Sequence, residues 1–190
     1  TIGYGSLLSL ESARESAPDL REFRLVTVRD YMRLINKVSP RWYGNSPGTS
    51  TVEEADHRVA SCAARPAPGV TLSCTAFAVT EADFRNLFER EHHYRWVDVP
   101  GVEADGTESV GRMCVEWTDA DFRRERCRSD AEYHDRVGRH YDGPIWRDDI
   151  LPFPPYLAEC LDAARSHGPA VLENFCETSF LADGTTTIAE

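Results

Sequence analysis

The chain has 190 residues, of which 41% are hydrophobic and 28% are charged, a composition typical of a soluble globular protein. Its 32 acidic and 21 basic side chains give a formal net charge of −11, which disfavours nucleic acids and anionic membranes as partners. No apolar run approaches the roughly 20 residues that span a bilayer, so we predict no membrane span. Without a repeat, low-complexity segment or linker, the sequence predicts one domain over residues 1–190.

The chain opens on a short predicted strand, Thr1-Ile2-Gly3, followed by the loop Tyr4-Gly5-Ser6-Leu7-Leu8. Glycines at positions 3 and 5 allow a ligand to approach the backbone closely. Ser9 is placed to cap a short helix over Leu10–Ser16, whose free N–H groups would face this loop. The segment is therefore suited to hold an anion, although an ordinary turn from strand to helix explains the same five residues.

Strand propensity and turn residues alternate over the next part of the chain. Strands are predicted at residues 23–28, 31–35, 58–64, 70–79, 94–99 and 110–117. The first two form a bent or paired unit. Turn chemistry predicts a surface loop at 39–50, a turn between antiparallel neighbours at 65–69 and a turn region at 101–106. Thr80-Glu81-Ala82-Asp83 resembles a capping box and predicts a helix from there to about His92.

The C-terminal half carries three predicted helical regions. Residues 118–141 form a charged helical insert, restarted by the capping box Ser129-Asp130-Ala131-Glu132, and its interleaved charges are typical of a solvated face. A helix follows from Tyr156 to His167, where Gly168 ends it, and a short one covers Ala170–Phe175. Successive strands broken by single helices predict an α+β fold, with a mixed, mostly antiparallel sheet that can curl into a small barrel.

Cysteine and histidine usage points away from bound metals. The six cysteines lack C-x-x-C spacing, which favours buried free thiols: Cys62, Cys74, Cys114, Cys127, Cys160 and Cys176. The adjacent His92-His93 and the pair His134 and His140 have no matching cysteine or carboxylate cluster, so we predict no structural zinc. Lys37 is the only lysine among the 21 basic residues, a bias that we attribute to genome composition.

Glu91 stands out within the predicted helix. Phe84, Leu87 and Phe88 define an apolar stripe, and Glu91 falls on that stripe, whereas Glu89 projects about 100° away from Phe88 into solvent. A carboxylate on the core side of a helix is costly unless it is paired or held in a cleft, where it can act as a general acid or base. In the alternative interpretation, Glu91 lies at a frayed helix end and pairs with a nearby arginine such as Arg90 or Arg95.

Two motifs together resemble the γ-glutamylcyclotransferase-like family. They are Gly3-Tyr4-Gly5-Ser6-Leu7 and Arg90-Glu91-His92-His93-Tyr94, and the resemblance covers roughly residues 1–100. It implies the family's fold, a mixed, mostly antiparallel β-barrel flanked by helices. Leu7 stands where one branch of the family has asparagine, so the loop is more similar to the glutathione-specific branch or an uncharacterised one. His92 and His93 replace the small residues usual between the glutamate and the tyrosine.

The resemblance also implies an activity. Tyr4, Gly5, Ser6, Leu7 and Leu8 would cradle a γ-glutamyl group, and Glu91 would be the catalytic residue acting on its α-amine. The substrate, glutathione or another γ-glutamyl peptide or amine, would cyclise to 5-oxoproline and release an amine without a metal or cofactor. Such an enzyme, a transferase or lyase of glutathione metabolism, would accelerate the reaction mainly by holding its flexible substrate in the geometry needed for ring closure.

Two rival hypotheses remain at this stage. A catalytically inactive relative could serve as a binding or assembly subunit of a larger protein complex, in keeping with the charged insert at 118–141 and the crowded histidines. A metal-dependent hydrolase built on His92, His93 and Glu91 is disfavoured because consecutive helical residues point about 100° apart. The chain starts at its first strand without an initiator methionine, so both a cytoplasmic location and an organelle lumen or stroma after removal of a targeting peptide stay open.

Overall fold

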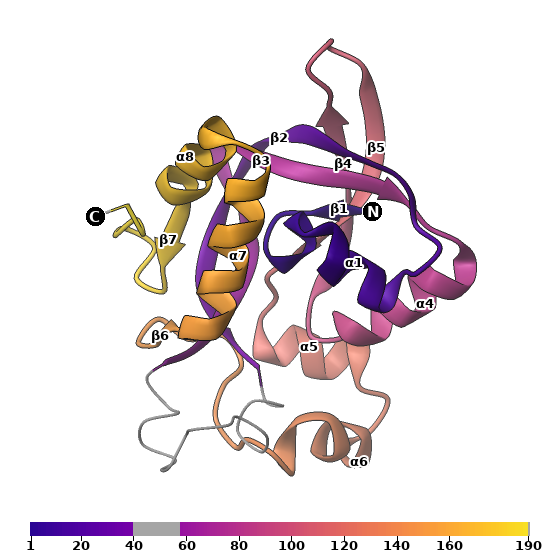
Figure 1. The fold of residues 1–190 in the computed structure, drawn as a ribbon. Coiled ribbons are helices and arrows are strands. Elements are labelled where there is room, and N and C mark those ends of the chain that lie inside the picture. Colours follow the sequence, from indigo (N-terminus) through magenta and orange to yellow (C-terminus); the bar gives the residue numbers. More distant parts are fainter. Residues whose placement is uncertain (40–57, 190) are drawn as a thin grey trace.

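A closed five-stranded barrel forms the centre of the protein (Figure 1). The computed structural model describes residues 1–39 and 58–189, so the predicted loop at 39–50 lies outside the described residues except for Ser39. The barrel strands are β1 (Ile2–Gly3), β2 (Arg21–Val38), β3 (Arg58–Ala78), β4 (Arg95–Val102) and β5 (Glu108–Val115). They follow the order β3-β1-β5-β4-β2, and pairing of β2 with β3 closes the barrel. Only β1 and β5 run parallel within it.

Two short strands extend the sheet beyond the barrel. β6 (Leu151–Pro152) pairs parallel with β3, and β7 (Ser179–Leu181) pairs parallel with β2. The sequence predicts neither, because both are too short to show an alternating pattern. The α+β class and the mixed, mostly antiparallel barrel predicted from the sequence are confirmed.

Helices surround the barrel. They are α1 (Leu10–Ser16), α4 (Glu81–Arg90), α5 (Asp119–Arg126), α6 (Asp130–Tyr133), α7 (Pro154–Ser166) and α8 (Pro169–Thr178), with single turns η1 (Ser6–Leu8) and η2 (His134–Gly138). Figure 1 shows α7 lying across the long β2 and β3 strands, and α1 packed beside α4. The predicted caps are present, since the side chains of Ser9, Thr80 and Ser129 each accept a backbone N–H of the first turn.

The predicted turn at 65–69 is wrong, because β3 continues through it. Its pairing with β2 is irregular there, as Tyr31 faces Pro66 while Arg29 faces Thr71. The extra residues form a bulge in which prolines need donate no ladder hydrogen bond. Gly69 adopts φ 85° in the bulge and donates its N–H to the Asp30 carboxylate at 2.8 Å. The two strands predicted at 23–28 and 31–35 belong to one strand, β2, with an irregularity between Arg29 and Tyr31, in keeping with the bent unit expected from the sequence.

The helix predicted to reach His92 ends earlier. α4 stops at Arg90, and Glu91 is its C-terminal cap residue with φ −96° and ψ 29°. The backbone then turns, with Tyr94 donating its N–H to the carbonyl of Glu91 at 3.0 Å, before β4 begins at Arg95. Glu91 therefore caps α4, with its N–H donated to the Leu87 carbonyl at 2.8 Å, and lies at the point where the chain leaves the helix.

The insert at 118–141 is helical as predicted, but it is not only a solvated face. Phe122 and Val137 are fully buried and pack with Ile145 and Cys127 in a small core of their own. All six cysteines are free thiols, five of them buried and Cys176 half-buried. None of the helices in the described ranges is long and apolar enough to cross a bilayer.

Candidate active site

A buried arginine fixes the loop that follows β1. Arg33 on β2 is fully buried, and its Nε donates to the carbonyl of Tyr4 at 2.7 Å. The same guanidinium donates to the Thr178 hydroxyl at 2.6 Å and to the carbonyl of Ser73, and it stacks over the Phe175 ring at 4.7 Å. Because these donors form a planar fork, the Tyr4 carbonyl is held in one orientation by an arginine that also contacts β3 and α8.

The five predicted binding residues of the loop occupy different environments. The Tyr4 side chain lies in the barrel core, Leu7 packs with the residues between α1 and α4, and Leu8 packs against α7 and α8. Ser6 alone of the five lines a cavity. A Cβ at Gly5 would lie 2.7 Å from the Tyr156 hydroxyl oxygen, so glycine lets the loop approach that phenol.

The turn η1 also presents backbone donors. Its hydrogen bonds are donated by Leu8 to the Gly5 carbonyl at 2.9 Å and by Ser9 to the Ser6 carbonyl at 3.0 Å. The N–H groups of Gly5, Ser6 and Leu7 precede these bonds, as the first N–H groups of any helical turn do. Of these three residues, Ser6 lines the cavity described next.

A cavity of about 260 Å³ brings Ser6 and Glu91 together. Its lining residues come from the loop, the ends of β2 and β3, the turn after α4, and α7: Ser6, Lys37, Ser39, Ser61, Arg90, Glu91, His93, Tyr94, Tyr156 and Glu159. The Glu91 side chain is only 16% exposed. The two sequence motifs, far apart in the chain, thus meet at one small polar cavity.

Arg90 connects the two motifs. Its Nε lies 3.3 Å from a carboxylate oxygen of Glu91, so the ion pair expected in the alternative interpretation is present. Its other donors reach the Ser6 hydroxyl at 3.2 Å, the Ser12 hydroxyl at 2.9 Å and the Ser12 carbonyl at 2.7 Å. Arg90 therefore holds the Glu91 carboxylate beside the loop and does not remove it from the cavity.

Two tyrosines complete the walls as neutral hydrogen-bonding groups. Burial raises the pKa of Tyr94 well above its usual value, and the negative charge of Glu91 raises it further. Burial also raises the pKa of Tyr156. The Tyr94 hydroxyl donates to the Cys62 carbonyl at 2.7 Å. Neither phenol can serve as a base near neutral pH, which leaves Glu91 as the buried carboxylate of the cavity.

The adjacent histidines pack as aromatic side chains. His92 and His93 are both buried, lie edge to face with ring centroids 5.8 Å apart, and contact Phe122 at 5.6 and 5.3 Å. His93 lines the cavity, whereas His92 does not. In the described part of the chain no group of three or more histidine, cysteine or acidic side chains is arranged to hold a metal ion.

His92 makes stability depend on pH. Burial lowers its pKa to about 4 from 6.5, and the charges of Arg136 and Arg126 add to this effect. Between these pH values the unfolded chain binds a proton that the folded chain does not, so stability falls as the pH drops from 6.5 towards 4. We expect a loss on the order of 2–3 kcal/mol in the free energy of unfolding, measured by denaturant titration across this range.

Substitution of His92 distinguishes its contribution to the pH dependence of stability from the contributions of other titrating groups. His92→Leu should flatten the decline in stability between pH 6.5 and 4, whereas His134→Gln, at an exposed position, should leave it unchanged. An unchanged decline in His92→Leu would show that other groups cause it.

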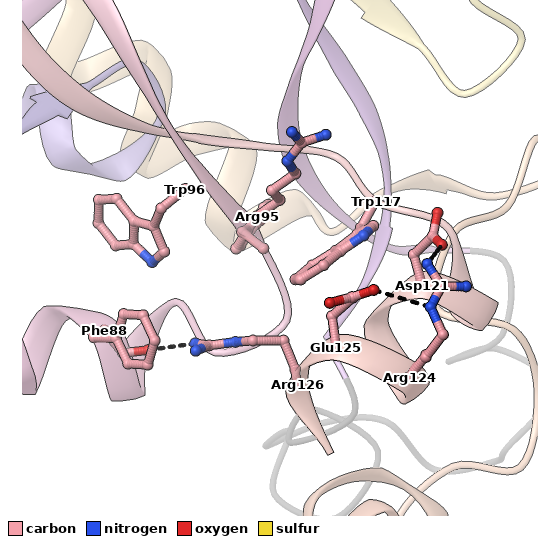
Figure 2. Close-up of a pocket in the computed structure, with 9 residues that line it drawn as sticks. Phe88, Arg95, Trp96, Trp117, Asp121, Arg124, Glu125 and Arg126 are labelled. Atoms are coloured by element: carbon pink, nitrogen blue, oxygen red, sulfur yellow. Dashed lines mark hydrogen bonds and ion pairs between the residues drawn. The ribbon is translucent and has the colours of Figure 1, made fainter. Parts of the chain in front are cut away.

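A larger cavity of about 550 Å³ lies between α4 and α5 and excludes both Ser6 and Glu91 (Figure 2). Its two carboxylates, Asp121 and Glu125, turn towards Arg124, which is hydrogen-bonded to both. Arg126 reaches across to α4, where it stacks on the Phe88 ring at 3.6 Å. The side chains of Asp121 and Glu125 are 35% and 54% exposed, against 16% for Glu91, so this cavity offers no comparably buried general base.

Comparisons with known proteins give structural matches only. No family model and no curated protein matches the chain. The solved structures that resemble it include a gamma-glutamyl cyclotransferase, at 15% identity and a TM-score of 0.47, covering 75% of this chain and 87% of that one. An uncharacterized human protein matches at 15% identity with a TM-score of 0.48, covering 75% of this chain and 87% of that one. A protein of Arabidopsis thaliana matches at 14% identity with a TM-score of 0.43, covering 70% of this chain and 84% of that one.

Sequence reasoning missed several lining residues. Lys37, Ser61 and Glu159 belong to no motif. Pairing of β2 with β3 brings the first two to the cavity, and the packing of α7 brings Glu159. Lys37 carried one usable signal, since it is the single lysine of an arginine-rich chain. Arg90 belongs to the second motif, but its contacts with Ser6 and Ser12 depend on α1 packing beside α4.

Proposed function

We propose that this protein is a γ-glutamylcyclotransferase-like enzyme that converts a γ-glutamyl compound into 5-oxoproline and a free amine. One observation carries the proposal: Glu91 and Ser6, each from one of the two family-like motifs, line the same cavity. The volume of about 260 Å³ suits a group of the size of γ-glutamyl. Tyr4, Gly5, Ser6, Leu7 and Leu8 form the binding loop, Ser6 through its side chain and the others through backbone and packing.

The reaction begins at the α-ammonium group of the substrate. The Glu91 carboxylate takes one proton from it, and the freed amine attacks the γ-carbonyl carbon. A new C–N bond closes the five-membered ring, and the carbonyl electron pair moves onto oxygen. The backbone N–H groups of Gly5, Ser6 and Leu7 are the available donors for this oxyanion.

Collapse of the intermediate completes the reaction. The carbonyl re-forms, and the bond to the leaving nitrogen breaks as protonated Glu91 returns its proton to that nitrogen. The ring nitrogen then gives up its second proton to the departing amine, which leaves neutral lactam and an ammonium product. No external nucleophile, metal or redox partner enters this balance. Glu91 acts first as the base and then as the acid. Its side chain is only 16% exposed and is held beside Arg90, which keeps the carboxylate close to the substrate and largely away from water.

A substrate panel tests the proposal. Purified protein is incubated with glutathione, γ-glutamyl dipeptides and γ-glutamyl amines, and 5-oxoproline is quantified by mass spectrometry. Release of 5-oxoproline from at least one class supports the enzyme and identifies the leaving group. Absence of release from every class, with binding of a protein partner over the cavity, would instead favour the non-catalytic subunit.

A further inference from the structure

The only lysine of the chain lies in the wall of the candidate active site. Lys37 is 5% exposed and lines the same cavity as Glu91. Lysine is rarely this deeply buried, because removing an ammonium group from water is costly. The other 20 of the 21 Lys and Arg residues are arginine, so the chain has the smaller cation only at position 37.

The position of Lys37 is fixed by its neighbours. Its carbonyl accepts the Ser61 hydroxyl at 3.0 Å, and the next residue, Val38, donates its N–H to the Ile145 carbonyl at 2.7 Å. The ammonium nitrogen lies 4.7 Å from the centre of the Tyr94 ring, whose hydroxyl is itself anchored to Cys62. The ring face stabilises the cation and orients it.

Lys37 and Glu91 place opposite charges in one small region. Both charges act on the buried thiol of Cys114. Burial raises the pKa of this thiol well above its usual value, and the negative charge of Glu91 raises it further. The positive charge of Lys37 lowers it. The other cation of the cavity wall, Arg90, directs its donors to the loop and to Glu91. Its role is thus to hold the protein groups together.

A γ-glutamyl group has a matching pattern of charges. Its α-ammonium and α-carboxylate groups are attached to the same carbon, so a site that brings the amine to Glu91 must also accommodate the carboxylate close by. A cavity holding a carboxylate and an ammonium is complementary to this zwitterion. A compact ammonium also needs less room above the Tyr94 ring than a planar guanidinium.

We infer that Lys37 Nζ binds the α-carboxylate of the γ-glutamyl group and thereby restricts the substrates to γ-glutamyl compounds whose α-carboxylate is free. This inference rests on the proposed function. In this arrangement Lys37 binds the α-carboxylate, and the N–H groups of the loop bind the oxygen of the amide that is cleaved.

Paired substrates test this role. Glutathione and γ-L-glutamyl-L-alanine are each compared with the analogue in which the α-carboxylate is an α-carboxamide. We expect the wild type to prefer the free acid by about 10- to 100-fold in kcat/KM, as for one charge-assisted hydrogen bond. Lys37→Met should lose most of this preference through a higher KM for the acid, with kcat and the carboxamide rates nearly unchanged.

A binding measurement gives a readout apart from turnover. L-5-oxoproline and 2-pyrrolidinone differ only in the carboxylate, and their affinities are measured by NMR titration. Lys37→Met should weaken 5-oxoproline binding about 10-fold or more and leave 2-pyrrolidinone unchanged. Lys37→Arg, which keeps the charge, should retain part of the affinity, and the exposed variant Arg29→Met should bind as the wild type does.

The outcomes separate the two proposals. If the wild type forms 5-oxoproline but accepts acid and carboxamide equally, or if Lys37→Met keeps the preference for the acid, the role of Lys37 is overturned and the proposed activity stands. If no γ-glutamyl compound is converted, the proposed activity fails, and the role of Lys37 fails with it.

Discussion

Glu91→Gln should slow the turnover of the γ-glutamyl substrate by about 10³-fold, the range typical of losing a general acid–base group. The amide keeps the size of the side chain but cannot take the proton from the substrate ammonium. KM should change little, because the amide still fills the same place in the cavity. Steady-state kinetics on the best substrate of the panel measure both constants.

A matched control lies two residues before Glu91, on α4. Glu89 is exposed and pairs with Arg136 at 3.0 Å, outside the cavity that Glu91 lines. Glu89→Gln should therefore keep turnover within a few-fold of the wild type. Circular dichroism and thermal unfolding must show both variants folded. Equal turnover in Glu91→Gln and wild type would overturn the assigned mechanism, whatever the substrate.

Arg33→Met should lower the free energy of unfolding by about 3–5 kcal/mol, because it leaves several buried groups without their donor. The carbonyls of Tyr4 and Ser73 and the hydroxyl of Thr178 all face the guanidinium. The loop after β1 would lose its interior support as well. For a chain of this size, the melting temperature should fall by at least about 6 °C.

The exposed Arg29 on the same strand provides the comparison. Arg29→Met removes the same charge and shape from β2 but should cost less than about 0.5 kcal/mol, because its side chain is in solvent. Chemical denaturation of both variants measures the difference. A loss in Arg33→Met no larger than in Arg29→Met would show that the buried hydrogen bonds contribute little, and that the loop is held by other contacts.

Local patterns predict much of the fold. The caps at Ser9, Thr80 and Ser129 depend on neighbouring residues only, and each forms as expected. The error at 65–69 has a physical cause: prolines and a glycine mark a turn in isolation, but in a paired strand they are also suited to a bulge. The bulge forms here because β2 and β3 pair on both sides of it, and the Asp30 carboxylate accepts the Gly69 N–H within it.

The candidate site is predicted in less detail. A helical stripe singles out Glu91, but the same pattern does not show that Glu91 is the residue that caps α4 and begins the following turn. The contact of its neighbour Arg90 with Ser6 requires α1 beside α4, which no local pattern reveals. Lys37 reaches the cavity only because β2 pairs with β3 over its whole length.

The sequence by itself determined the α+β class, the helix caps, the free cysteines and two motifs with one carboxylate of interest, because each depends on composition or on residues within a few positions. Only the tertiary structure decided that Ser6, Lys37 and Glu91 share one cavity. It also decided that the buried Arg33 supports the loop through the Tyr4 carbonyl. These relations require the barrel to close, and closure is set by long-range strand pairing, which is not encoded in any single segment.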